Sequence, residues 1–313
     1  MTDAPAPDAP AIELASASRW YGNVVAVNDV SFRLDGGVTG LLGPNGAGKS
    51  TILHMIAGFL APSSGSVTIR GESAWRRPEM YRSIGLVPER EAVYPFLSGR
   101  QFVRANALLQ GLPPAEAEAA TARAIGQVEL QDAQDRPIGT YSKGMRQRAK
   151  VAAALVHEPP ILLLDEPFNG MDPRQRLHMM DLLRRMSAEG RTILFSSHIL
   201  EEVERVAQRV LVIVAGRLAA SGDFREIRRL MTDRPHTFTV RSSDNRALAA
   251  ALLRLPTIGG VELSDGILTV RTADFGAFSR AVASVARRAD IRLHELRPTD
   301  ESLESVFSYL VRR

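Results

Sequence analysis

The 313-residue chain has no cysteine, few lysines and no long apolar run. The absence of cysteine excludes disulfides, thiolate metal sites and a cysteine nucleophile, and it fits a reducing compartment. The most apolar runs, at 161–164 and 210–216, fall far short of the roughly 20 residues that a membrane-spanning helix requires. We therefore expect a soluble chain whose role at a membrane would need a partner.

The charged residues are also spread along the chain. The formal net charge is +4 and the isoelectric point is near 9.7, but no block of like charge dominates, so we expect no nucleic-acid partner. The opening MTDAPAPDAP lacks a basic region followed by an apolar stretch, so it does not have the pattern of a secretory signal. We predict a disordered lead over residues 1–11.

Residues 12–232 alternate between β-type and helical patterns, which predicts a large α/β domain. Three compact apolar runs, at 161–165, 192–198 and 209–216, are of the kind that is buried on both faces of a parallel sheet. Between them and the first strands, about residues 97–158 are alanine-rich and periodic at three to four, which predicts a helical subdomain.

A boundary is predicted at 231–235, where the α/β alternation ends. Residues 236–313 then follow the order strand, helix, strand, strand, helix, strand, helix, with a turn at Asp265-Gly266. This order resembles a split βαβ unit and predicts a small α+β C-terminal domain.

The segment GPNGAGKST follows a predicted strand and opens a predicted helix, as in a phosphate-binding loop. Its glycines allow backbone N–H groups to converge on phosphate oxygens, Lys49 can reach the β and γ phosphates, and Ser50 can ligate Mg²⁺. The predicted binding residues of this loop are Gly43, Pro44, Asn45, Gly46, Ala47, Gly48, Lys49, Ser50 and Thr51. The alternative is a glycine loop without a ligand.

Two further strands end in groups suited to the same site. In ILLLDE, Asp165 can lie beside the Mg²⁺ and Glu166 can orient and deprotonate a water, although an acidic pair by itself is usually a solvated strand end. In TILFSSH, His198 can reach the γ-phosphate, although an isolated histidine is more often structural. Three strand ends are thus expected to converge on one nucleotide.

With these motifs in place, residues 12–230 resemble the nucleotide-binding subunit of ABC transporters. GPNGAGKST resembles the Walker A motif, ILLLDE the Walker B motif, and NGMD, which ends at Asp172, the D-loop. His198 resembles the switch histidine, and Tyr21 the aromatic residue that stacks on adenine, with Trp20 as the alternative. The resemblance implies an ABC-type P-loop ATPase fold with ATP and Mg²⁺ as cofactors.

The segment YSKGM occupies the place of the LSGGQ signature in this family. Ser142 and Gly144 match, whereas Tyr141, Lys143 and Met145 depart from the pattern. The function needs a helix N-terminus, a hydroxyl and an uncrowded glycine N–H, and a lysine there adds positive charge to the same anion site. The resemblance implies a head-to-tail homodimer or heterodimer, in which Ser142, Lys143 and Gly144 meet the ATP held by the other subunit.

Glu89 replaces the glutamine that the family usually carries in its Q-loop. A carboxylate is still a hard oxygen ligand for Mg²⁺, so our hypothesis is that Glu89 keeps the metal contact and links it to a transmembrane partner. The alternative is a solvated loop acid.

The leading hypothesis is an ATPase subunit that works with separate integral-membrane permease subunits at the cytoplasmic face of the cell membrane. The C-terminal DESLESVF resembles that of export ATPases, which favours export. The alternatives are a soluble ABC ATPase acting on ribosomes or DNA, and a P-loop kinase or transferase. We expect the C-terminal domain to help dimerise or regulate the ATPase.

Overall fold

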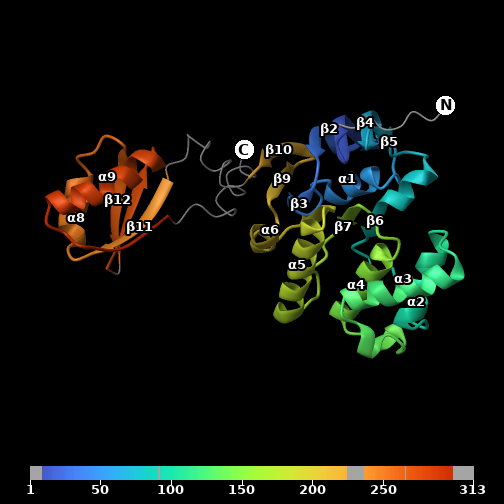
Figure 1. The fold of residues 1–313 in the computed structure, drawn as a ribbon. Coiled ribbons are helices and arrows are strands. Elements are labelled where there is room, and N and C mark those ends of the chain that lie inside the picture. Colours follow the sequence, from blue (N-terminus) through green and yellow to red (C-terminus); the bar gives the residue numbers. More distant parts are fainter. Residues whose placement is uncertain (1–8, 91, 224–235, 265, 299–313) are drawn as a thin grey trace. The chain divides into compact units, whose positions relative to one another are not determined.

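The computed structural model describes residues 9–90, 92–223, 236–264 and 266–298 (Figure 1). The chain divides into two compact units, Met1–Ser221 and Gly222–Arg313. Most of the predicted lead, the predicted boundary segment and the predicted final helix lie outside the described residues. The domain limits at 232 and 236 therefore stay predictions.

Six strands form the main sheet of the first unit, in the order β10-β9-β3-β8-β7-β6. They are β3 (Gly37–Leu42), β6 (Ile84–Val87), β7 (Ile161–Leu164), β8 (Thr192–Ser197), β9 (Arg209–Val214) and β10 (Arg217–Gly222). Strands β9, β3, β8, β7 and β6 pair in parallel. Every residue of β7 and β8 is buried, as apolar strands in a covered parallel sheet should be. The predicted α/β class is confirmed.

A second, antiparallel sheet has the order β2-β1-β4-β5. Its strands are β1 (Ile12–Tyr21), β2 (Val24–Leu34), β4 (Ser64–Ile69) and β5 (Glu72–Ser73). Helix α1 (Lys49–Ile56) lies between the two sheets (Figure 1), and its apolar residues belong to one core that strands of both sheets line. Because α1 packs against both sheets, the position of the loop that precedes it is fixed.

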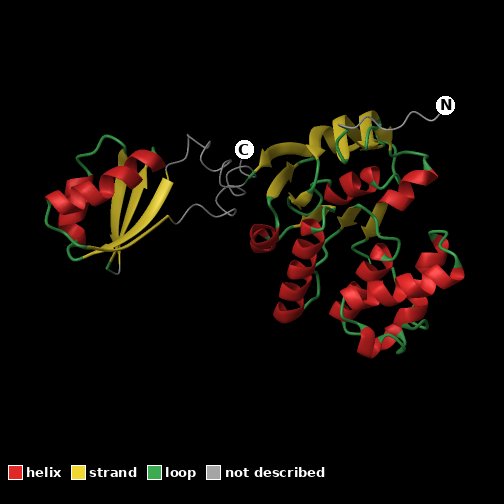
Figure 2. Cartoon of the chain, viewed as in Figure 1, coloured by secondary structure: helices red, strands yellow, loops and turns green. Residues whose placement is uncertain are grey.

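The predicted helical subdomain consists of α2 (Gly99–Leu109), α3 (Pro114–Gln127) and α4 (Lys143–Leu155), which pack against one another (Figure 2). Ser98 and Gln101 form a capping box at the start of α2, and Pro114 occupies the first turn of α3, where a missing N–H costs nothing. Short 3-10 helices span Pro78–Ser83, Gln131–Ala133 and Ile138–Thr140. Helices α5 (Pro173–Ala188) and α6 (Leu200–Val206) follow β7 and β8.

The second unit is a four-stranded antiparallel sheet in the order β12-β13-β11-β14, covered by two helices. Its elements are β11 (His236–Ser242), α8 (Asn245–Leu252), β12 (Ile258–Ser264), β13 (Ile267–Thr272), α9 (Phe275–Arg288) and β14 (Leu293–Pro298). Phe238 and Phe278 are central to its separate apolar core. The order of elements matches the predicted split βαβ pattern as far as β14.

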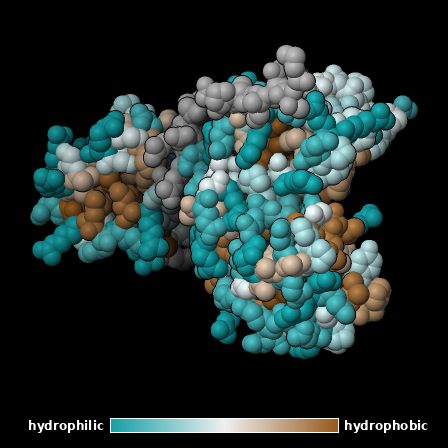
Figure 3. Space-filling model, turned by 45° about the vertical axis from the view of Figure 1, so that its right-hand side comes forward, coloured by the Kyte–Doolittle hydropathy of each residue, from teal (hydrophilic) through white to brown (hydrophobic). Residues whose placement is uncertain are grey.

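Within the residues that the structure describes, every helix is too short or too polar to cross a bilayer. On the face drawn in Figure 3, hydrophilic residues predominate and the apolar residues form separate patches.

Candidate active site

The direction of the parallel strands determines where the candidate site lies. Because β3, β6, β7 and β8 run parallel, their carboxyl ends meet at one edge of the main sheet. The segments that leave this edge are the glycine loop at 43–48, Pro88-Glu89, Asp165-Glu166 and Ser197-His198. The predicted catalytic residues are therefore brought to the same edge, although Lys49 and His198 are 149 positions apart in the sequence.

The glycine loop has the backbone conformation that the phosphate-loop pattern requires. Gly46 and Gly48 have φ values of +79° and +102°, and a Cβ at Gly48 would clash with the carbonyl oxygen of Ala26. Gly48 is the N-cap of α1, and no side chain caps the helix. The first N–H groups of α1 are thus left to an external acceptor, which suits an anion.

Lys49 joins this loop to the acidic pair. The lysine is 6% exposed, and its Nζ donates hydrogen bonds to the carbonyl oxygens of Gly43 at 2.8 Å and Pro44 at 3.3 Å. The same Nζ lies 3.5 Å from Oε1 of Glu166. Two motifs that are more than a hundred residues apart thus share one buried ion pair.

Glu166 is held on its other side by His198. The Nδ1 of His198 lies 2.9 Å from Oε2 of Glu166, and it donates the hydrogen bond because an ionised carboxylate can only accept. Glu166 also has a left-handed backbone, with φ at 48°, which costs a non-glycine residue free energy and is a feature that gathers at functional sites. The structure therefore joins Lys49, Glu166 and His198 into one contact series.

Ser196 fixes the position of the acidic pair. Its Oγ donates to Oδ1 of Asp165 at 2.5 Å and accepts from the backbone N–H of Glu166 at 2.8 Å. Sequence reasoning missed this residue, although two serines directly before His198 offered a signal. A single buried hydroxyl thus orients both acids.

A cavity of about 300 Å³ opens beside these groups. It is lined by Ala26, Asn45, Gly46, Gly48, Lys49, Ser50, Thr51, Glu89 and Glu166. Ser50 and Glu89 therefore line the same space as the glycine loop. Asp165 is 3% exposed and stands behind the lining, held by Ser196.

Oxygen atoms are the candidate metal ligands here. Among the described residues, no three His, Cys, Asp or Glu side chains are clustered as a ready-made metal site. The Ser50 hydroxyl and one or two carboxylates fit Mg²⁺, which prefers oxygen and usually keeps waters and substrate phosphates as its other ligands. The residues present are thus compatible with a Mg²⁺ that arrives with its nucleotide.

The two aromatic candidates at the end of β1 are both half exposed. Trp20 is 46% and Tyr21 44% exposed, and the guanidinium of Arg19 lies 4.9 Å from the centre of the Tyr21 ring. Consecutive residues of a strand face opposite sides, so one adenine could stack on one of them but not on both. The choice of Tyr21 remains a prediction.

The signature residues lie at the start of α4 and line a different space. Ser142 is the N-cap, where its Oγ accepts from the backbone N–H of Met145, and a Cβ at Gly144 would clash with Gln175. Lys143 packs over Gly170 and lines a cavity of about 170 Å³ with Glu89 and Asn169. The described lining of the Lys49 cavity contains none of residues 142–144.

Tyr141 departs from the signature for a structural reason. Its side chain is 4% exposed, and its hydroxyl donates to the carbonyl oxygen of Ala133 at 2.6 Å. The ring packs against Gly99, where a Cβ would clash with the hydroxyl. Tyr141 therefore fastens the start of α4 to the 3-10 helix Gln131–Ala133 and to the start of α2, within the helical subdomain.

Two buried charged residues that sequence reasoning did not assign brace this edge of the sheet. Glu202 on α6 accepts from Ser197 Oγ at 2.7 Å and lies 3.3 Å from a guanidinium nitrogen of Arg176, next to the His198 turn. Burial raises the pKa of Glu202 above its ordinary value, against the opposing effects of Ser197 and Arg176. The other residue is Lys150 on α4, which is 6% exposed and donates to the Pro88 carbonyl oxygen at 2.7 Å.

An open parallel sheet with a glycine-rich phosphate loop and an acid pair at neighbouring strand ends defines a P-loop nucleoside triphosphatase. A family model described as "ABC transporter" matches residues 27–169. The linearmycin resistance ATP-binding protein LnrL of Bacillus subtilis (strain 168) is 32% identical over 310 residues, 96% of this chain and 98% of that protein.

A second relative, Nod factor export ATP-binding protein I of Rhizobium meliloti, is 39% identical over 218 residues, 68% of this chain and 64% of that protein. A solved structure of an ATP-binding subunit of an ABC transporter has a TM-score of 0.63 at 32% identity, covering 70% of this chain and 92% of that one. The chain therefore belongs to the ABC transporter family, as an ATP-binding subunit. The predicted fold and the predicted transport ATPase are confirmed, and these relatives give no support to the ribosome or DNA alternative.

Proposed function

We propose that two copies of the chain, or this chain and a similar one, hold two ATP molecules between them. Each ATP is bound by the glycine loop of one copy and by Ser142, Lys143 and Gly144 of the other. The observation that carries the proposal is the Lys49–Glu166–His198 contact series beside a cavity that residues 142–144 do not line. A single chain would then hold an incomplete site.

Glu166 is the proposed base. It accepts a proton from the attacking water while the water oxygen bonds to the γ-phosphorus, and the bond from that phosphorus to the bridging oxygen of the departing ADP breaks. The Nδ1 of His198 orients the Glu166 carboxylate, and the other ring nitrogen of His198 is left to contact the γ-phosphate. Both residues act from buried or half-buried strand ends, which keeps their geometry fixed.

Lys49 would exchange partners when the triphosphate enters. Its present acceptors are two backbone carbonyls and Glu166. A phosphate oxygen is a stronger acceptor than a neutral carbonyl, so the amine is expected to turn to the phosphates. That turn would release Oε1 of Glu166 to bind the attacking water.

The proposed metal ligands are Ser50, Asp165 and Glu89. When bound, Mg²⁺ supplies neutralisation of the charge that develops on the phosphate oxygens. Ser50 and Glu89 line the cavity, and Asp165 has a second carboxylate oxygen besides the one that accepts from Ser196.

Tyr21 is the residue that we propose stacks on the adenine ring. Asp172 caps α5, where its Oδ1 accepts from the backbone N–H of Gln175, and it is proposed to lie at the interface between copies.

Export through separate membrane subunits is the proposed biological role. Relatives named for Nod factor export and for linearmycin resistance support this direction. The DESLESVF segment that first suggested export lies outside the described residues. The chain would then be peripheral, at the cytoplasmic face of the cell membrane, bound through its permease partner.

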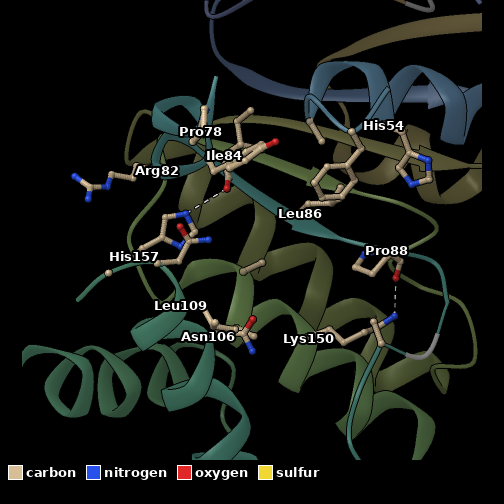
Figure 4. A pocket seen from close by; sticks show the side chains of 18 of the residues that line it. His54, Pro78, Arg82, Ile84, Leu86, Pro88, Asn106, Leu109, Lys150 and His157 are labelled. Carbon is tan, nitrogen blue, oxygen red and sulfur yellow. Dashed lines mark hydrogen bonds between the residues drawn. The ribbon is translucent and has the colours of Figure 1, made fainter. Parts of the chain in front are cut away.

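A groove of about 660 Å³ is the proposed permease surface (Figure 4). It lies between the 3-10 helix Pro78–Ser83, β6, α2 and α4, and its lining includes the exposed Phe59 and Tyr81 and the 85% exposed Leu109. Burial lowers the pKa of His157, which donates to the Ile84 carbonyl oxygen, so this histidine is uncharged near neutral pH. A short amphipathic helix from a membrane subunit fits such a surface.

The purified chain, with ATP and no acceptor molecule, tests the enzymatic part of the proposal. Release of inorganic phosphate supports ATP hydrolysis, whereas dependence on an added acceptor would indicate a kinase or transferase. Affinity isolation from membranes tests the partner: a co-eluting integral membrane protein supports a transporter, and co-sedimentation with ribosomes contradicts it.

The second unit has its own core, so its proposed role in dimerisation or regulation can be tested by deleting residues 236–313. We expect the shortened chain to keep the melting temperature of the first unit and to dimerise more weakly with ATP. Unchanged dimerisation, ATPase activity and transport would refute this role.

A further inference from the structure

Lys150 is a buried lysine whose amine points at backbone oxygens. It is 6% exposed, and its Nζ donates to the carbonyl oxygen of Pro88 at 2.7 Å (Figure 4). The same Nζ donates to the carbonyl oxygen of Arg90 at 3.1 Å, with that of Glu89 at 3.4 Å. An ammonium group carries three N–H donors, so it can serve all three carbonyls of this loop. The contact joins residues that are about sixty positions apart in sequence.

Each end of this contact leads to a different part of the proposed site. The loop at 88–90 carries Glu89, which lines the Lys49 cavity. Helix α4, which carries Lys150, begins at Lys143 directly after the cap Ser142. At about 1.5 Å rise per residue, Lys150 stands roughly 10 Å along the helix from Lys143, on one rigid element.

Lys150 also lies between two cavities. It lines the groove proposed for the membrane subunit and the smaller cavity that Glu89 and Lys143 share. A displacement of α4 by a bound partner would therefore pull on the loop backbone through the Lys150 amine. The loop has no helix or strand of its own to hold its position, so this contact matters for the direction of Glu89.

We propose that Lys150 is a positioning residue that fixes the backbone of Glu89 to the signature helix, so that Glu89 and residues 142–144 move together. The proposal rests on the proposed function of Glu89 and of the signature. Lys150 is not one of the proposed ligands of the nucleotide or the metal. It acts on the rate of hydrolysis through the backbone that carries Glu89.

Arg148 provides a matched control on the same helix. Its guanidinium donates to the carbonyl oxygens of Val128 and Glu129 at 3.2 and 2.9 Å, so it also fastens α4 to a loop. That loop carries no proposed site residue. Arg148→Met and Lys150→Met therefore each remove one cation from backbone carbonyls, but the second alone releases Glu89.

Hydrogen–deuterium exchange of the full-length chain without nucleotide tests the anchor itself. We expect Lys150→Met to raise exchange in peptides covering residues 87–93 and Arg148→Met to leave it unchanged. Lys150→Arg, which keeps a cationic donor, should restore at least part of the protection. Equal exchange in the wild type and Lys150→Met would overturn the proposal, whether or not the chain proves to be an ATPase.

ATP hydrolysis by the same variants tests the consequence. We expect Lys150→Met to lower kcat on the order of tenfold, with KM for ATP nearly unchanged because the Lys49 loop is untouched. In a Glu89→Ala background, Lys150→Met should have almost no further effect on kcat. A further fall of similar size in that background would show that Lys150 does not act through Glu89. A wild type without ATPase activity would instead refute the proposed function.

Discussion

Glu166 and His198 are joined by a hydrogen bond of 2.9 Å between Oε2 and Nδ1. The opposite oxygen of Glu166 lies 3.5 Å from the amine of Lys49, so the carboxylate is held from both sides. Its backbone is left-handed, with φ at 48°. The proposed base is thus a non-glycine residue held in a left-handed backbone conformation.

Glu166→Gln should slow hydrolysis without abolishing ATP binding. Glutamine keeps the size of the side chain and an acceptor for His198, but it cannot take a proton from water. We expect kcat to fall about 100-fold or more and the ATP affinity to change by less than a few-fold, measured by phosphate release and by equilibrium binding. Glu201→Gln, an exposed acid at the start of α6, serves as the control. Full activity of Glu166→Gln would show that Glu166 is not the base.

Tyr141→Phe should affect stability rather than catalysis. The change removes the buried hydroxyl that donates to the Ala133 carbonyl and leaves that acceptor unsatisfied, at a cost of about 1–2 kcal/mol in the free energy of unfolding. Denaturant unfolding measures the loss, and the kcat per folded molecule should stay unchanged. The exposed Tyr94, changed to Phe, should lose much less stability. A large fall in kcat would indicate that Tyr141 does contribute to the site.

Glu202 should make stability depend on pH. Its pKa is raised above the ordinary 4.5 by burial, so the folded state binds this proton more tightly than the unfolded state does. Its stabilising contribution is therefore complete below the ordinary pKa and is lost as the pH rises through the folded-state value.

Glu202→Gln removes this titration while keeping an acceptor for Ser197. We expect the melting temperature of the variant to rise relative to that of the wild type as the pH increases from about 4.5 to 8. Circular dichroism melts of both proteins across that range measure the difference. A difference that stays constant or falls with pH would contradict a raised pKa at Glu202.

The catalytic strand ends could be predicted because their signals are local. GPNGAGKST combines loop chemistry with helix initiation, and the ILLL and TILF runs predict covered parallel strands whose ends must share an edge. The polar strand β10 and the division of the strands into two sheets could not be predicted in this way. Strand β10 alternates between exposed and partly buried residues at the sheet edge, so it lacks the apolar run that marked its neighbours.

Contacts between distant segments also escaped prediction. Lys150 was visible as one of the few lysines, but its partners are backbone carbonyls, which have no sequence signature. Ser196 and Glu202 act on the acid pair and on the His198 turn through contacts that depend on how β7, β8 and α6 pack. Such contacts follow from tertiary geometry, which the one-dimensional pattern does not contain.

The central claim is that each ATP site is shared between two copies, and mixing two defective variants tests it most directly. Lys49→Ala disables the glycine loop, and Ser142→Asp keeps a good helix cap while placing a negative charge against the γ-phosphate. Each variant should be inactive by itself. A mixed dimer joins the intact loop of one copy to the intact signature of the other, so an equal mixture should recover up to roughly one quarter of the wild-type phosphate release. No recovery on mixing, or full activity of Ser142→Asp alone, would contradict a site built from two subunits.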